Sequence, residues 1–117
     1  MLTDKAKKQI LASVLETIYN ISDRQYQMRV WIRGEGSEVD DFDETCCNFF
    51  GDVDPLLENY NDFGIKESQY IYLRKFRDKF RLFSSKYYHP FEFIDTPEWD
   101  EIVNMAKGVL EAFDYKR

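Results

Sequence analysis

Apolar residues recur along most of the chain at the three- and four-residue spacing of one helix face. The first stripe predicts a helix from Thr3 or Asp4 to about Asn20, and contains Ile10, Leu11, Val14, Leu15 and Ile18. A second stripe predicts a helix over residues 66–87 and contains Leu73, Phe76, Phe80, Phe83 and Tyr87. A third follows the capping residue Thr96 and Pro97, and contains Trp99, Ile102, Val103, Ala106, Val109, Leu110 and Phe113.

The segment between the first and second stripes predicts shorter elements. Ser22 and Gln25 have the spacing of a capping box, which favours a helix that ends before Gly34. Its apolar residues also alternate as in a strand, but the chain offers no second strand to pair with it, so we favour the helix. Two further short helices are expected: one capped by Asp40 or Asp41 and ended by Gly51, and one begun by Asp54 and Pro55 and ended at Gly64.

Length and composition then define the fold class. The 117 residues suit one domain spanning 1–117. The apolar share of 44%, with ten Phe and eight Tyr, is ample for a core, while five Gly and three Pro are too few for a turn-rich sandwich. We therefore expect an all-α fold, a compact single-domain bundle of five or six helices.

No stretch of the sequence has the length and apolarity of a membrane span, and charged residues interrupt the first ten positions, unlike a signal peptide. Two adjacent cysteines, Cys46 and Cys47, form neither a disulfide framework nor a metal-ligand spacing. We expect a monomeric cytoplasmic protein that does not bind membranes.

Charge changes this picture because it is distributed unevenly. The formal net charge is −6, yet residues 1–33 carry +3 and residues 65–117 carry +1. Residues 34–64 carry ten acidic side chains and no Lys or Arg, a charge of −10. Such a segment repels phosphate groups and attracts basic proteins. The alternative is a solvated acidic loop that caps the next helix.

We predict that this acidic segment binds a basic partner protein. The predicted partner-binding residues are Glu35, Glu38, Asp40, Asp41, Asp43, Glu44, Asp52, Asp54, Glu58, Tyr60 and Asp62. Aromatic anchors are expected beside such charges, and Trp31, Phe42 and Tyr60 lie in or next to the segment. Each of the three can instead belong to the core, which we favour for Phe42.

The sequence offers little for catalysis, metals or cofactors. His89 is the only histidine, and no nucleophile motif surrounds it or the two cysteines. The acids fit neither a calcium-binding loop nor a di-iron site. Gly34 and Gly36 lack the third glycine of a dinucleotide loop, since Val39 stands there. We therefore expect no enzyme activity, no metal and no cofactor.

An alternative function comes from a basic run on the polar side of the second stripe. Its members are Arg74, Lys75, Arg77, Lys79 and Arg81, interrupted by Asp78. A helical regulatory or adaptor domain could use this Arg74–Arg81 face to hold nucleic-acid phosphates. A solvated face, partly paired with the acidic segment, is the interpretation we favour.

A family resemblance narrows the partner class. Residues 31–44 (WIRGEGSEVDDFDE), CCNFF at 46–50, NDFGI at 61–65 and FEFIDTPEW at 91–99 resemble short bacterial immunity proteins of contact-dependent growth inhibition systems. The resemblance implies neutralisation of a cognate toxin domain in the cytosol. A basic nuclease, with a ribonuclease among the candidates, is the expected target. No toxin-contacting residue is carried over from the family to this chain.

Overall fold

The computed structural model describes residues 2–35, 41–87 and 89–116, and these ranges contain six α-helices and no β-strand. The expected all-α fold is confirmed. The helices are α1 (Asp4–Ser22), α2 (Arg24–Tyr26), α3 (Phe42–Glu58), α4 (Glu67–Ser84), α5 (Pro90–Phe93) and α6 (Pro97–Ala112). A π-helical segment, η1 (Gln27–Ile32), follows α2, and a short 3₁₀ turn, η2 (Tyr60–Phe63), follows α3.

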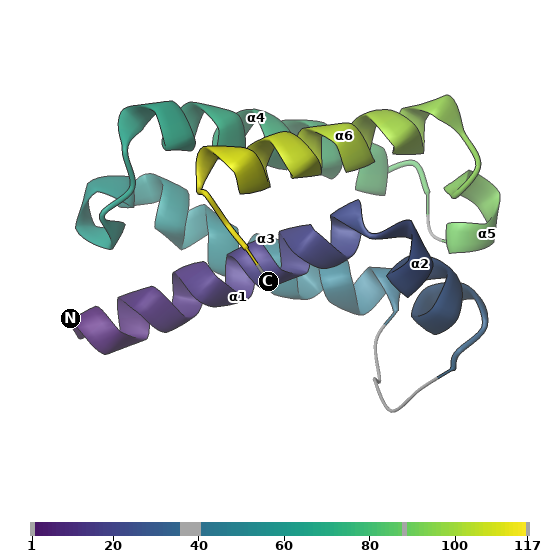
Figure 1. Ribbon diagram of the computed structural model, residues 1–117, viewed down its shortest axis with the longest axis horizontal. Helices are drawn as coiled ribbons and strands as arrows, with labels where there is room; N and C mark the ends of the chain where they lie inside the picture. The colour runs from purple at the N-terminus through teal and green to yellow at the C-terminus, as the bar shows by residue number, and fades with distance from the viewer. Residues whose placement is uncertain (1, 36–40, 88, 117) are drawn as a thin grey trace.

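The four long helices form the bundle (Figure 1). Helix α6 packs on both α1 and α4, and α3 packs on the same two helices from the other side. The short elements α2, η1 and α5 close one end of the bundle, where η1 packs on α5. None of the described helices is both long and apolar enough to cross a membrane.

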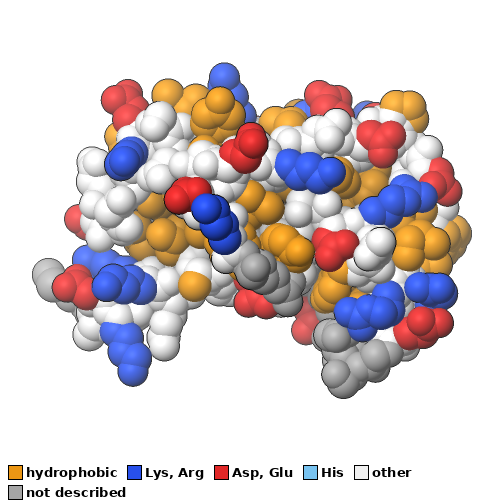
Figure 2. Space-filling view, viewed as in Figure 1, with side chains coloured by type: hydrophobic (Ala, Val, Ile, Leu, Met, Phe, Trp, Pro, Cys, Tyr) orange, Lys and Arg blue, Asp and Glu red, His pale blue; other side chains and the backbone are white. Residues whose placement is uncertain are grey.

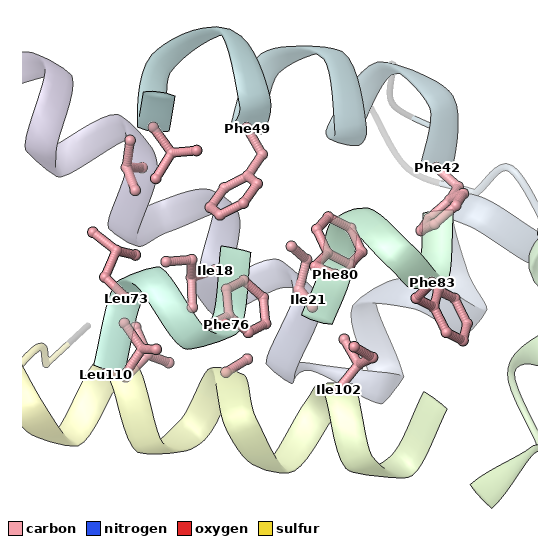
Figure 3. Packing of buried hydrophobic residues seen from close by; sticks show 14 of the residues in the cluster. Ile18, Ile21, Phe42, Phe49, Leu73, Phe76, Phe80, Phe83, Ile102 and Leu110 are labelled. Atoms are coloured by element: carbon pink, nitrogen blue, oxygen red, sulfur yellow. The ribbon is translucent and has the colours of Figure 1, made fainter. Parts of the chain in front are cut away.

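The core combines aromatic rings on α3 and α4 with aliphatic side chains from all four long helices. Figure 3 shows Phe49 of α3 and Phe76 and Phe80 of α4 pointing into one interior, with Ile18 of α1 and Ile102 of α6 beside them. All five side chains are fully buried. Phe49 makes edge-on contacts with Phe76 and Phe80, at centroid distances of 5.5 and 5.7 Å. Such geometries add to the stabilisation that burial of the ring area provides.

A buried amide links the closed end of the bundle to α1. Gln27 is fully buried, and its side-chain NH₂ donates to the carbonyls of Asn20 and Ile21 at 3.0 and 2.7 Å. Its Oε1 accepts a 2.9 Å hydrogen bond from the indole N–H of Trp99 on α6. The Ile21 carbonyl lies in the last turn of α1, where carbonyls lack a partner four residues on, while the Asn20 carbonyl also accepts from the backbone N–H of Asp23. Gln27 therefore fixes η1 against both α1 and α6.

The two short helices predicted between residues 40 and 64 are one continuous helix, so Gly51 does not end a helix and Asp54-Pro55 does not begin one. Glycine ends a helix by taking a positive φ, and of the described glycines only Gly34 and Gly64 have one. The buried stripe continues past Gly51 through Val53, Leu56 and Leu57. Pro55 removes only the hydrogen bond to the carbonyl of exposed Gly51, which water can reach.

Three of the predicted helix caps are confirmed, and two predicted helix ends differ in the structure. Thr3, Asp41 and Thr96 cap α1, α3 and α6 as expected, each accepting from a backbone N–H three residues on. The predicted cap at Ser22 is wrong: Ser22 is the last residue of α1, and Asp23 caps α2 by accepting from Tyr26. The predicted helix over 66–87 ends early, at Ser84, because Tyr87 instead packs against Phe83 and Phe93.

Candidate partner-binding site

The predicted acidic residues lie on several sides of the molecule rather than on one face. Glu38 and Asp40 lie outside the described residues. The exposed carboxylates Asp41, Asp43 and Glu44 gather at the N-terminal end of α3, with Glu35 earlier in the chain. Glu58 is also exposed but lies at the other end of this helix, about 22 Å away at 1.5 Å per residue. Asp62 is exposed in η2, which follows α3.

Two acids in the middle of α3 face neighbouring helices. Asp52 accepts a 3.4 Å hydrogen bond from the hydroxyl of Ser13 on α1. Asp54 faces α4, where its two carboxylate oxygens accept from Arg77 and Arg81 at 2.8 and 2.7 Å. Asp54 therefore holds α3 against α4, and its charge is already neutralised within the chain.

The environment of Asp54 changes its pKa. Partial burial by itself raises the pKa, but the hydrogen bonds and charges of Arg81 and Arg77 outweigh it and lower the pKa below its ordinary value. Arg77 is mostly buried, with 20% of its side chain exposed. Its guanidinium also contacts Asp78 at 2.7 Å. Burial by itself lowers the pKa of Arg77, but the hydrogen bonds and charges of Asp78 and Asp54 outweigh it and raise that pKa above its ordinary value.

The acids at the start of α3 have two roles. Asp41 is the N-cap: its side chain accepts a 2.7 Å hydrogen bond from the backbone N–H of Glu44. Asp43 and Glu44 occupy the first turn, where the helix dipole favours negative charge. Among the described residues no Lys or Arg forms an ion pair with any of these three carboxylates, so they remain open to a basic partner.

A pocket that the sequence did not reveal lies beside this acidic turn. It has a volume of about 310 Å³ and is lined by Phe42, Asp43, Cys46, Cys47, Phe50, Ser84 and Tyr87. The α3 residues share one side of the helix, at spacings of three and four, and all of them precede Gly51, so the short helix predicted there was enough to group them. The contribution of Ser84 and Tyr87 required knowledge of how α4 packs.

The pKa of the Cys46 thiol is shifted by its surroundings in this pocket. The pKa of its thiol is raised to about 12, chiefly by burial and in the same direction by the negative charges of Asp43, Cys47 and Asp41. The thiol therefore stays protonated and unreactive at neutral pH. The pocket is thus weakly polar and lies in a negative field.

The three aromatic candidates for partner contact are largely used by the fold. Phe42 is 3% exposed and Trp31 is 9% exposed, and both belong to the core. They contact each other edge-on at 5.6 Å. Tyr60 is half-buried and stacks on Tyr70 of α4 at 4.2 Å. The preference for Phe42 as a core residue is confirmed, and Trp31 takes the same role.

The basic run on α4 is mostly occupied by ion pairs. Arg77 and Arg81 bind Asp54, Arg74 lies 3.9 Å from Asp78, and Lys79 lies 3.4 Å from Glu101 of α6. The guanidinium of Arg81 also lies 4.7 Å from the centroid of the Phe50 ring. The predicted pairing of this run with the acidic segment is therefore confirmed for Asp54.

His89 is the histidine that an acid–base catalytic site in this chain would have to use. His89 is exposed between α4 and α5, and its ring stacks on Phe91 at 5.3 Å. Within the part of the chain that the structure describes, no three His, Cys, Asp or Glu side chains come together as metal ligands would.

The face formed by α1 and α6, shown in Figure 2, carries acidic and basic side chains side by side.

The fold and the site together define an all-α bundle with unpaired carboxylates and a small apolar pocket at one end of α3. No protein-family model, curated protein or solved structure matches the chain.

Proposed function

We propose that this protein is an immunity protein that binds a cognate basic toxin domain, a nuclease, and neutralises it by covering its active site. The proposal follows the resemblance of residues 31–65 and 91–99 to immunity proteins of contact-dependent growth inhibition systems. In this function the protein acts in the cytoplasm, as a monomer and without catalysis of its own.

One observation carries the proposal: the chain's own cations leave most of the acidic segment unneutralised. Of the described acids between residues 34 and 64, only Asp54 and Glu35 form ion pairs, the latter with Arg33 at 3.7 Å. Asp41, Asp43 and Glu44 are exposed and adjacent. A cluster of unpaired carboxylates is attractive to a nuclease, whose substrate-binding groove is basic because it holds phosphates.

The neutralisation mechanism requires only binding. Carboxylates at the start of α3 take the positions that substrate phosphates occupy in the toxin groove, and the rigid bundle keeps the substrate out. Close charge pairs across such interfaces couple by about 1.5–7 kcal/mol, and the opposite fields of the two proteins also speed association. Association should therefore slow as salt screens the charges.

The test combines cell protection with association kinetics. The experiment first identifies a basic toxin domain in a gene beside this one and then uses that domain, purified as an inactive variant, as the partner. The double variant Asp43→Asn, Glu44→Gln removes two charges but leaves the Asp41 cap in place. We expect its association rate at low salt to fall roughly three- to ten-fold, with a smaller difference at high salt.

The matched control is Glu98→Gln, Asp100→Asn, which removes two carboxylates from the first turn of α6. It should retain the association rate of the unmodified protein, and His89→Ala should retain full protection of toxin-expressing cells. Equal rates for the two double variants, or protection at far less than one molecule per toxin molecule, would contradict the proposal.

A further inference from the structure

The pocket between α3 and the end of α4 combines apolar walls with a single acidic rim. Phe42, Phe50 and Tyr87 supply aromatic surface, Cys46 supplies a protonated thiol, and Asp43 is the one charged residue of the lining. The volume of about 310 Å³ is small, which suits one side chain better than a drug-sized ligand.

The charges around the pocket favour a cationic occupant. No Lys or Arg belongs to its lining, and the nearby cation Arg81 is held by Asp54 at 2.7 Å. Asp43 is exposed and, among the described residues, forms no ion pair. Asp41 adds a second negative charge close by, and both acids act on the Cys46 thiol inside the pocket.

The walls favour a guanidinium over an ammonium. A planar guanidinium stacks on aromatic rings and binds a carboxylate through two parallel hydrogen bonds, whereas an ammonium is a strongly hydrated point charge. The chain already makes one contact of this kind. The guanidinium of Arg81, which is not part of the pocket lining, lies 4.7 Å from the centroid of the Phe50 ring.

We infer that this pocket receives an arginine side chain of the basic partner, with its methylene stem against Phe42, Phe50 and Tyr87 and its guanidinium on Asp43. The inference rests on the proposed function, because it names the anchor through which the toxin domain docks. Interface hot spots often contain an arginine whose methylene stem packs on apolar side chains and whose charged guanidinium is removed from water.

The experiment titrates the intact protein with N-acetyl-arginine amide and follows its backbone amide resonances by NMR. Saturable shifts are expected at Asp43, Cys46, Cys47, Phe50 and Tyr87. N-acetyl-citrulline amide has the same shape without the charge and should bind about five-fold more weakly, which is the upper end of the range for an exposed ion pair. The lysine amide should bind with intermediate affinity.

Two single variants test the geometry. Asp43→Asn removes the rim carboxylate, and Glu44→Gln removes a carboxylate from the same helix turn outside the pocket lining. We expect about five-fold weaker binding of the arginine amide to Asp43→Asn and less than about two-fold to Glu44→Gln. Equal losses, equal binding of citrulline amide, or shifts centred elsewhere would overturn the inference.

The two proposals fail in different ways. Saturable arginine binding without toxin neutralisation would leave the pocket intact as an arginine site and reject the proposed function. Salt-dependent toxin binding that Asp43→Asn and Glu44→Gln weaken equally would keep the proposed function and reject the pocket as the anchor.

Discussion

At the residue scale, Asp54 shows how packing decides the role of a charge. It lies in the acidic segment, yet its carboxylate is held by Arg77 and Arg81 of α4. About 38% of the side chain is exposed, so solvent screening keeps the contribution of these ion pairs to stability small. Asp54 therefore fastens α3 to α4 and is a poor candidate for contact with the proposed partner, whereas Asp43 and Glu44 remain available.

This role of Asp54 predicts a pH-dependent stability difference. Because the folded-state pKa of Asp54 is below its ordinary value of about 3.9, its stabilising contribution is complete above that value and is lost as the pH falls through the folded-state pKa. Asp54→Asn should lower the free energy of unfolding by about 1 kcal/mol at pH 7. The difference from the unmodified protein should shrink below about pH 4.

Urea unfolding between pH 3 and pH 7, on the scale set by the carboxyl pKa of about 3.9, measures this effect. The control is Asp62→Asn, which removes an exposed carboxylate that forms no ion pair among the described residues. It should stay within about 0.5 kcal/mol of the unmodified protein. A difference for Asp54→Asn that grows toward acid would contradict the assignment.

At the element scale, α3 is the decisive helix, since it carries both the acidic turn and one wall of the pocket. Its continuity through Gly51 and Pro55 is set by tertiary packing of the buried stripe, which outweighs the weak helix propensity of both residues. Gly64 differs because its φ of 71° is required for the turn that follows η2.

The two glycines therefore predict opposite effects of alanine. Gly51→Ala should stabilise the protein by roughly 0.5–1 kcal/mol, because Gly51 is helical and an added Cβ meets no atom within 4 Å. Gly64→Ala should destabilise it by about 1–2 kcal/mol, because alanine is strained at positive φ. Thermal and urea unfolding of both variants measure the effects, and changes of the same sign would contradict the helical assignment of Gly51.

At the scale of the whole molecule, the net charge of −6 hides an unequal distribution. Four of the five basic residues of α4, all but Lys75, are paired with Asp54, Asp78 and Glu101. Among the described residues, the acids at the start of α3 have no such partners. The described part of the molecule therefore presents an open acidic end and a basic helix whose charges are mostly neutralised. This distribution supports a basic protein partner and disfavours a phosphate backbone.

We predict that the protein does not bind nucleic acid. Fluorescence anisotropy of a labelled single-stranded oligonucleotide at low salt should show no binding. The triple variant Asp54→Asn, Asp78→Asn, Glu101→Gln frees the cations of α4 and should bind weakly, with an affinity that falls as salt rises. Salt-dependent binding by the unmodified protein would instead support the alternative function as a nucleic-acid adaptor.

Much of the fold was predictable because helix formation follows local periodicity. The stripes that become α1, α4 and α6, and the caps Thr3, Asp41 and Thr96, depend on residues three or four positions apart. The errors fell where a local signal was ambiguous. Gly51 and Pro55 are common at helix ends, and only the burial of Val53 and Leu56 beyond Gly51 keeps α3 continuous.

The sequence by itself determined the all-α class and the concentration of acids between residues 34 and 64. Only the tertiary structure decided which of those acids are free, because an ion pair such as Asp54 with Arg77 joins residues 23 positions apart through the packing of two helices. The pocket is likewise completed by Ser84 and Tyr87 from beyond α3. Charge is a property of the residue, whereas its availability depends on which helix lies beside it.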